Sequence, residues 1–417
     1  MKRYLYFIAL TVPVLFFLNY WIKPLQSGNN ELADPVSGLS PRLSEFDRNI
    51  LEFEKYIYSE IEKSGTVGAA LVITRDNETI LLKCYGVRKA GENEPVDPET
   101  RFRLASVSKT ITGTLAGILD GKGILKLDEK IKDIIPGFRL KDSVNTADLS
   151  IRHILSHTSG LVPHAYDNLV EAGLPFDVLM DSLQRVNISA PPGILYGYQN
   201  LVFSLYDTLS SLKTGKDFSS LLGEYLFEPL GMQHSGSGYN GFTSGGNIAY
   251  PHRRSGTAFK PLKMNNRYYN TQPAAGISTS ISDLGIFLKA LTGNDTVALP
   301  AQILDTVFSP QVVTPLRRNY LRHWDPVDSR HYSLGWRIIG YKGRTIAYHG
   351  GYIQGYRAEI AVCLEEKTGI AFLSNSPGNV ASKVVPEFLN RYFDMLDDPE
   401  YVEPGQQDPP ITLVREY

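Results

Sequence analysis

The feature that most limits the fold of this chain is the position of its strand-forming segments, which lie toward both ends and enclose a helix-rich middle. Residues 66–91 contain two runs of β-branched and aliphatic residues, separated by the turn sequence RDNET at 75–79, and this pattern predicts a hairpin. Similar runs follow near the C-terminus, at residues 332–340, 344–350, 356–366 and 369–376. Because a strand must pair to satisfy its backbone, we predict that both chain ends build one antiparallel sheet.

Helical periodicity marks the segments that would cover this sheet. Residues 43–65 repeat apolar side chains at helical spacing and end on Gly65, and a last helical pattern spans 380–396. Between residues 106 and 257, helical patterns alternate with loops that contain Pro and Gly. The predicted fold class is therefore α/β (α+β): an antiparallel sheet flanked by helices, with an inserted and mostly helical lobe.

These patterns divide the chain into segments. We predict a signal anchor or signal peptide at 1–22, a linker at 23–45, an α/β domain made of 46–105 and 258–400, a helical domain at 106–257, and a C-terminal tail at 401–417. A cleft between the two domains is the expected place for a ligand.

The first segment indicates export. The run YLYFIALTVPVLFFLNYWI at 4–22 is close to the roughly 20 residues that span a bilayer. Lys2 and Arg3 precede it, and no small-residue cleavage pattern follows it, which favours an uncleaved anchor over a cleaved signal peptide. The basic residues predict a cytoplasmic N-terminus, with the remaining chain periplasmic or at the cell surface and held at the membrane.

Composition excludes one class of partner. The 417 residues are 42% hydrophobic and 21% charged, with a formal net charge of -2, which is typical of a globular protein and argues against nucleic-acid binding. The two cysteines, Cys84 and Cys363, both fall in predicted strands. We expect free thiols there rather than a disulfide.

The stretch FRLASVSKTITG at 102–113 places Ser106 and Lys109 one helical turn apart, where an extended segment gives way to a helix. The partial positive charge of a helix N-terminus would favour a developing alkoxide, and burial would lower the pKa of the lysine toward that of a useful base. The alternative is an ordinary solvated lysine. A second Ser-x-x-Lys pair, Ser210 and Lys213, shows that the spacing alone is not specific.

Four blocks in order make the context specific. They are FRLASVSKTITG at 102–113, LSIRHILSHTSGL at 149–161, PPGILYGYQN at 191–200 and YHGGYIQGYRAEI at 348–360. Together they resemble the serine β-lactamase and penicillin-binding protein superfamily, in the branch of class C β-lactamases, D-alanyl-D-alanine carboxypeptidases and related esterases. The resemblance covers about residues 46–395, and PAAGISTSISDLGIFLKAL at 273–291 supports it.

The resemblance implies a role for each matching residue. Ser106 corresponds to the acylated nucleophile and Lys109 to its activating base. Tyr198 corresponds to the tyrosine that passes a proton to the leaving group, and Asn200 to the asparagine that orients the lysine and the substrate. The two backbone N–H groups that bind the oxyanion correspond to those of Ser106 and Tyr352.

The third motif departs from the lysine-threonine-glycine of many relatives, because His349, Gly350 and Gly351 stand there. The two glycines are expected to let a substrate backbone approach closely. Histidine is mostly neutral at pH 7, where lysine is charged. We therefore expect weaker recognition of a substrate carboxylate, unless Arg357 or another cation compensates.

Other motif matches are set aside. The YDN triplet at 166–168 fits tyrosine-x-asparagine but lacks the preceding Pro-Pro-Gly, and the literal KTG triplets at 213–215 and 367–369 are expected at a helix end and in a turn. His153 and His157 have the spacing of a zinc pair without the glutamate of H-E-x-x-H. We expect neither a metal nor a cofactor.

The predicted function is a serine hydrolase that acts through an acyl-enzyme on amide or ester bonds of a peptide or small molecule. A D-alanyl-D-alanine carboxypeptidase and a β-lactamase proper stay open as alternatives, because the same residues serve all three reactions. A non-catalytic cell-envelope binding protein on the same fold is the remaining alternative.

Overall fold

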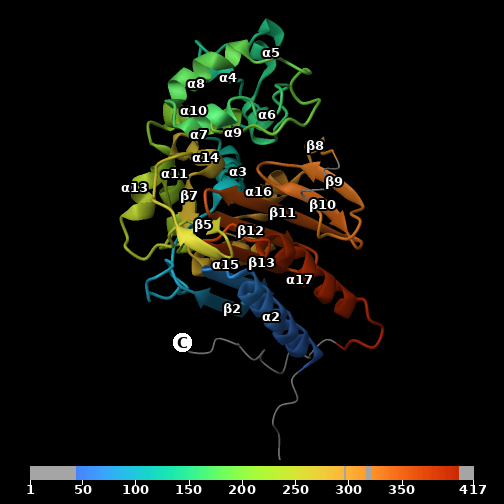
Figure 1. Ribbon diagram of the computed structural model, residues 1–417. Coiled ribbons are helices and arrows are strands. Elements are labelled where there is room, and N and C mark those ends of the chain that lie inside the picture. The colour runs from blue at the N-terminus through green and yellow to red at the C-terminus, as the bar shows by residue number, and fades with distance from the viewer. Residues whose placement is uncertain (1–43, 295–296, 316–320, 403–417) are drawn as a thin grey trace, which may run out of the picture. The chain divides into compact units, whose positions relative to one another are not determined.

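The computed structural model of the protein describes residues 44–294, 297–315 and 321–402. Its main element is an eight-stranded antiparallel sheet with the strand order β2-β1-β13-β12-β11-β10-β9-β8 (Figure 1). The strands are β1 (Gly68–Arg75), β2 (Glu78–Gly86), β8 (Val312–Val313), β9 (Ser329–Tyr332), β10 (Arg337–Tyr341), β11 (Arg344–Ile353), β12 (Tyr356–Cys363) and β13 (Thr368–Ser374). Since β1 pairs with both β2 and β13, both ends of the chain share one sheet, and the predicted fold class is confirmed.

Two long helices, α2 (Glu45–Ser64) and α17 (Ala381–Leu396), lie side by side on one face of the sheet (Figure 1). Gly65 ends α2 in the left-handed conformation, with φ of 66°. The helices contact each other through apolar side chains, and the rings of Phe53 and Phe388 lie 5.5 Å apart. The helices expected at 43–65 and 380–396 are therefore confirmed.

The opposite face of the sheet is covered by α15 (Ile281–Lys289) and by the elements around α3 (Ser108–Gly121). Almost all of α3 is buried, and it packs against α16 (Ala301–Phe308). A Cβ at Gly113 would lie 1.8 Å from the carbonyl oxygen of Leu334. Helix and loop backbones therefore touch directly, which fixes α3 relative to the sheet.

The segment between α3 and the second half of the sheet is mostly helical. Its helices are α4 (Ile131–Ile134), α5 (Ser143–Asp148), α6 (Ile151–Leu155), α7 (Asp167–Ala172), α8 (Phe176–Ser182), α9 (Asn200–Phe203), α10 (Leu205–Thr214), α11 (Phe218–Leu222), α12 (Glu228–Leu230) and α13 (Gly238–Thr243), and α14 (Gln272–Ala275) follows. A three-stranded sheet joins β3 (Phe102–Arg103), β7 (Ile277–Thr279) and β4 (Gly236–Ser237), and a separate hairpin pairs β5 (His252–Ser255) with β6 (Ala258–Pro261). The domain boundaries expected near residues 106 and 257 stay a prediction.

One predicted strand is broken in the structure. The sequence pattern at 332–340 predicts a continuous strand, but β9 ends at Tyr332 and β10 begins at Arg337. Gly335 lies between them with φ of 77°, and a Cβ there would lie 1.9 Å from the carbonyl oxygen of Lys109. The chain turns at this point to form a hairpin, in which Tyr332 pairs with Arg337, and Gly335 lets this turn touch the backbone of α3.

Within the described residues, neither Cys84 nor Cys363 forms a disulfide. Cys84 lies in β2 and Cys363 in β12, and β1 and β13 separate these strands in the sheet. The predicted anchor at 1–22, the linker up to residue 43 and the tail from residue 403 lie outside the described residues. Within the described ranges, no helix combines the length and apolar character needed to cross a bilayer.

The contact at Gly113 predicts a destabilising substitution. Alanine in a helix interior normally stabilises by about 1 kcal/mol relative to glycine. Here Gly113→Ala places a Cβ against backbone atoms, so we expect a loss of about 1–3 kcal/mol or more in the free energy of unfolding, measured by urea denaturation. Gly241→Ala in α13, where a Cβ has open space, is the matched control and should not destabilise. Equal effects of both substitutions would contradict the packing.

Candidate active site

Ser106 lies on a single 3₁₀ turn, Ala105–Val107, that joins β3 to α3. The residue before it, Ala105, has φ of 49°, in the left-handed region that residues other than glycine rarely adopt. This turn places Ser106 at the wall of a cavity of about 640 Å³. A strained backbone beside a hydroxyl in a cavity is typical of a functional position.

Tyr198 makes the direct contact with Ser106. Its phenol donates a hydrogen bond of 2.8 Å to the Ser106 hydroxyl oxygen. The Lys109 nitrogen lies 4.7 Å from the centre of the Tyr198 ring. The described residues include no direct hydrogen bond between Ser106 and Lys109. Instead, both residues contact Tyr198: Ser106 contacts its hydroxyl group, and Lys109 lies near its ring.

Lys109 is fully buried, and its amine donates to the side-chain oxygen of Asn200 at 2.8 Å and to the carbonyl oxygen of Ala274 at 2.9 Å. Burial disfavours the charged form and lowers the pKa of Lys109 to about 7. Asn200 thus contacts the amine that the resemblance expects it to orient. The Ala274 carbonyl was not predicted, because a backbone acceptor leaves no residue-type signal in the sequence.

Two charged residues that sequence analysis missed act on this lysine. Asp167 raises the pKa of Lys109, against the larger effect of burial, and Arg337 lowers it. Asp167 also accepts a hydrogen bond of 3.1 Å from the Asn200 amide and lies 2.8 Å from a ring nitrogen of His164. Asp167 is the middle residue of the YDN triplet, which does not serve as the tyrosine-x-asparagine motif but contributes its aspartate.

His157 holds the Tyr198 segment in place. The carbonyl of His157 accepts from the Gly197 N–H at 2.8 Å, and its Nδ1 accepts from the Gln199 N–H at 3.3 Å. The His157 and Tyr198 rings lie 4.3 Å apart. Burial lowers the pKa of His157 well below its usual value, so the imidazole is neutral and supports the phenol through packing.

Strand β11 presents an open edge next to Ser106. β10 pairs with β11 only as far as Tyr348, so the following residues lack a partner strand on that side. The two-residue turn after Ile353 makes Tyr352 and Arg357 a non-hydrogen-bonded pair, so the Tyr352 N–H points to the open edge. This is the direction that an oxyanion-binding N–H requires.

The glycines of β11 serve contacts within the chain. A Cβ at Gly351 would lie 2.4 Å from the Leu104 carbonyl oxygen and 3.1 Å from the Ser106 nitrogen, so this glycine lets the serine turn touch the strand. A Cβ at Gly350 would lie 2.5 Å from a carboxylate oxygen of Glu359. Sequence analysis expected both glycines to make room for a substrate backbone. In the structure, atoms of the protein itself occupy the space next to each glycine.

His349 is buried and uses both ring nitrogens internally. Nδ1 lies 2.9 Å from the Gly350 carbonyl oxygen, which can only accept, so Nδ1 carries the proton and Nε2 accepts from the Tyr332 phenol at 3.1 Å. Burial, then Arg337 and Lys109, lower the pKa of His349 well below its usual value. His349 is thus a neutral residue of the cavity wall.

Arg357 is paired with an acid in the same cavity. It donates to Glu359 at 3.0 Å, and Tyr348 donates to the same carboxylate at 2.7 Å. Glu359 is buried, and burial raises its pKa to about 7 despite these partners. The expected compensating cation therefore already has a partner, whereas Arg337 lines the cavity close enough to influence Lys109 and His349.

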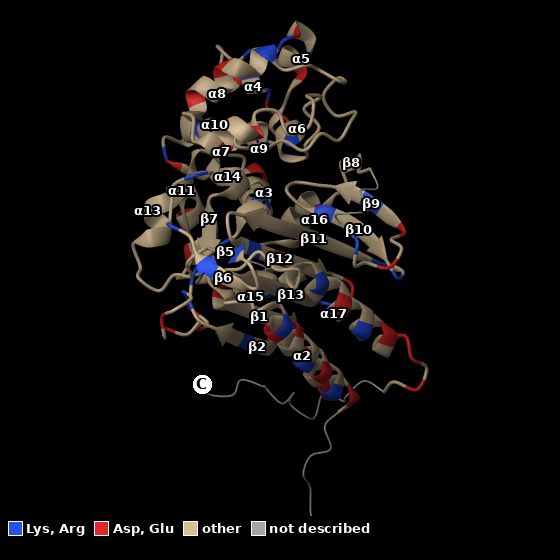
Figure 2. Cartoon of the chain, viewed as in Figure 1, with Lys and Arg blue, Asp and Glu red and all other residues tan. Residues whose placement is uncertain are grey.

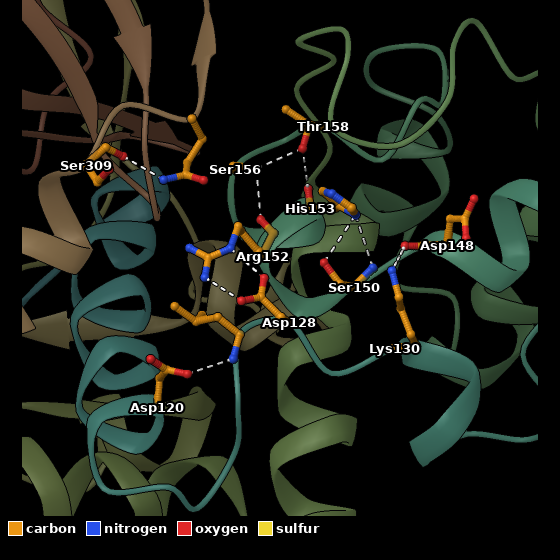
Figure 3. A network of polar contacts seen from close by, with 12 residues as sticks. Asp120, Asp128, Lys130, Asp148, Ser150, Arg152, His153, Ser156, Thr158 and Ser309 are labelled. Carbon is orange, nitrogen blue, oxygen red and sulfur yellow. Dashed lines mark hydrogen bonds and ion pairs between the residues drawn. The ribbon is translucent and has the colours of Figure 1, made fainter.

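The rejected matches have structural roles. Lys213 pairs with Glu129 at 2.6 Å on the surface, and Ser210 donates to the Asp207 carbonyl. Figure 3 shows His153 turned toward Ser150, whose N–H and hydroxyl lie 3.2 Å from its Nδ1, so this ring caps a helix. No group of three or more His, Cys, Asp or Glu residues suited to a metal occurs in the described part of the chain.

Comparisons with known proteins identify the family of this chain. The model of the Beta-lactamase family matches residues 46–390. The chain is 25% identical over 355 residues to the unguisins hydrolase ungD of Aspergillus violaceofuscus, a match that covers 78% of this chain and 61% of that protein. It is 20% identical to protein flp of Staphylococcus aureus, with 81% and 65% covered. The chain thus spans less than two thirds of these relatives.

A solved structure shares the fold. The octameric penicillin-binding protein homologue from Pyrococcus abyssi superimposes with a TM-score of 0.71 at 20% sequence identity, covering 82% of this chain and 77% of that one. A shorter match, 31% identical over 171 residues, links the chain to penicillin-binding protein 4 of Amycolatopsis lactamdurans, with 40% and 44% covered.

The charges around Lys109 predict two opposite shifts. In protein carrying ¹³C-labelled lysine, an NMR titration should give Lys109 a pKa of about 7. Asp167→Asn should lower this pKa because it removes a nearby negative charge, and Arg337→Gln should raise it because it removes a positive one. Asp133→Asn, on the exposed surface of α4, should leave it unchanged. Shifts of the same sign would show that these charges do not act on Lys109 directly.

Proposed function

Because this chain belongs to the β-lactamase family of hydrolases, we propose that it cleaves amide or ester bonds through an acyl-enzyme formed on Ser106. The observation that carries the proposal is the group of three side chains described above. A phenol hydrogen-bonds the serine, and a buried lysine with a pKa of about 7 lies against the phenol ring. Such a lysine is partly neutral at physiological pH and can accept a proton.

Attack begins with the neutral amine of Lys109. The Ser106 oxygen bonds to the acyl carbon while its proton passes to Lys109, whose other two positions are held by Asn200 and the Ala274 carbonyl. The developing oxyanion is stabilised by the N–H groups of Ser106 and Tyr352 at the open edge of β11.

Collapse of the tetrahedral intermediate requires a proton on the leaving group. The Tyr198 phenol, 2.8 Å from the serine oxygen, gives its proton to the departing oxygen or nitrogen and regains one from the Lys109 ammonium. The net result moves the serine proton to the leaving group. Water then attacks the acyl-enzyme by the same route in reverse, which releases the acid and restores Ser106.

Among possible substrates, we place peptides and esters first. His349 stands where many relatives carry a lysine cation, and its buried neutral ring cannot bind a carboxylate as a lysine would. This supports a hydrolase of peptides or esters over a D-alanyl-D-alanine carboxypeptidase, and either over a β-lactamase proper. A non-catalytic binding protein would not need a depressed lysine pKa next to a hydrogen-bonded serine.

The acyl-enzyme can be trapped directly. Intact mass spectrometry after mixing with a p-nitrophenyl ester or a penicillin should show one added acyl group. This group should be lost in Ser106→Ala. It should be retained in the control Ser210→Ala, which changes the serine of the unrelated Ser-x-x-Lys pair. Ester turnover, as kcat/KM, should rise with pH through about 7, because only the neutral form of Lys109 accepts the serine proton. Full labelling of Ser106→Ala would refute the nucleophile.

We also propose that the hydrolase works outside the cytoplasm, tethered through residues 1–22, with a small molecule or peptide as its substrate. The apolar run at 4–22 and the basic residues before it support this placement. In cells expressing the full chain, protease added outside the inner membrane should degrade residues 44–402, and the protein should sediment with membranes. Protection of these residues until the inner membrane is broken would contradict the proposed location.

A further inference from the structure

A second cavity, of about 540 Å³, adjoins the active site and is strongly basic. Its walls come from the β5–β6 hairpin, from the loop that follows β6, and from the turn between β11 and β12. Four cationic residues line it: Arg253, Arg254, Lys263 and Arg267. Figure 2 shows Lys and Arg gathered at β5 and β6. No acidic residue is among its described lining residues.

These cations lack acidic partners within the chain. Among the described residues, none of the four forms an ion pair, although ion pairs are frequent elsewhere on the surface. The chain as a whole carries a formal net charge of -2, so the positive charge is a local concentration. Arg254 is partly engaged elsewhere, because it donates to the Ser64 carbonyl oxygen at 3.4 Å and its guanidinium lies 4.9 Å from the centre of the Phe259 ring. The remaining like charges at this cavity repel each other, and an anion bound among them would relieve that repulsion.

The wall between the two cavities is well defined. Gly355, with φ of 90°, lets the β11–β12 turn press against β5, because a Cβ there would lie 2.6 Å from the backbone nitrogen and oxygen of His252. The Asn265 amide donates to Gln354 of the same turn at 2.6 Å. His252 is itself buried and held by the Ala90 N–H at 3.0 Å and the Asn375 carbonyl at 2.9 Å. The basic cavity therefore has a fixed position relative to β11.

Tyr352 connects the two cavities. It lines both of them, its side chain is 60% exposed, and its backbone N–H is the second proposed oxyanion donor. A molecule bound at Ser106 that extends along the open edge of β11 would pass this ring and enter the basic cavity. A flat basic surface would suit a membrane, whereas a hollow that continues the active site suits part of a substrate.

We propose that this second cavity binds an anionic group, a carboxylate or a phosphate, carried on the acyl part of the substrate. The inference rests on the proposed acyl-transfer function and specifies its substrate class. Guanidinium groups bind both anions through paired hydrogen bonds. This preference for an anionic substrate would arise in a cavity that does not include His349. It therefore does not depend on the lysine that many relatives carry at the position of His349.

Matched ester pairs test this preference. The substrates are p-nitrophenyl monoesters of linear dicarboxylic acids of increasing chain length, their methyl-capped twins, and analogues that end in phosphate. The acid-to-methyl-ester ratio of kcat/KM should rise at least tenfold at the chain length that reaches the cavity. The phosphate-ended esters show which anion is preferred. A ratio near one at every length would overturn the proposal.

The variant Arg253→Gln/Arg267→Gln should return this ratio to near one, because neither side chain is otherwise tied to the fold by a described ion pair. Lys122→Gln/Lys132→Gln, which removes two exposed charges elsewhere, is the control and should keep the ratio. An unchanged ratio in the arginine variant would overturn the proposal. If the arginine variant kept the ratio but no longer sedimented with phosphatidylglycerol vesicles, the cations would be assigned to a lipid surface instead.

A binding measurement separates this inference from the catalytic one. If no ester is turned over, the proposed function fails, but calorimetric titration of Ser106→Ala protein with the longest monoester still tests the cavity. Adding Arg253→Gln and Arg267→Gln to the Ser106→Ala protein should weaken binding of the monoester at least fivefold. This difference in affinity should be smaller at high salt. Equal affinities with and without the arginines would refute the cavity even where hydrolysis occurs.

Discussion

The rest of the structure depends on the backbone contact between β11 and the turn that carries Ser106. Gly351 has no side chain where the Leu104 carbonyl and the Ser106 nitrogen approach the strand, so two backbones meet without intervening atoms. Similar contacts at Gly113 and Gly335 fix α3 against the loop before β10. The serine is thus held by main chain on both sides, at an open strand edge, and its position does not rely on flexible side chains.

Electrostatics around this fixed point follow from burial more than from specific pairing. Lys109, His157 and His349 are all buried, and burial is the largest cause that lowers the pKa of each. The two histidines become neutral packing groups, while Lys109 keeps a pKa of about 7 because Asp167 partly offsets burial. Asp167 is therefore the charged residue that opposes the lowering of the Lys109 pKa by burial.

Sequence analysis found the residues whose chemistry shows in local motifs and missed those brought in by tertiary contacts. Ser106, Lys109, Tyr198 and Asn200 each stand in a short recognisable block, and the structure brings them together. Asp167 stands in the YDN triplet that was set aside as a motif match, and Arg337 stands in a predicted strand. Both act on Lys109 through space, and the Ala274 carbonyl belongs to no residue type. Strands and long helices followed from periodicity, but the hairpin turn at Gly335 falls within an apolar run, so periodicity alone does not separate β9 from β10.

The pairing of β1 with β13 also governs how the molecule can be made. Ala69 in β1 pairs with Ser374 in β13, so a contact of the main sheet joins residues that are far apart in the sequence. Contacts of such large sequence separation slow folding, since a long loop must close before they form. During synthesis, β1 and β2 emerge as an isolated hairpin with an unpaired edge that is prone to aggregation. The β13-facing edge of β1 therefore stays unpaired until β13 has emerged.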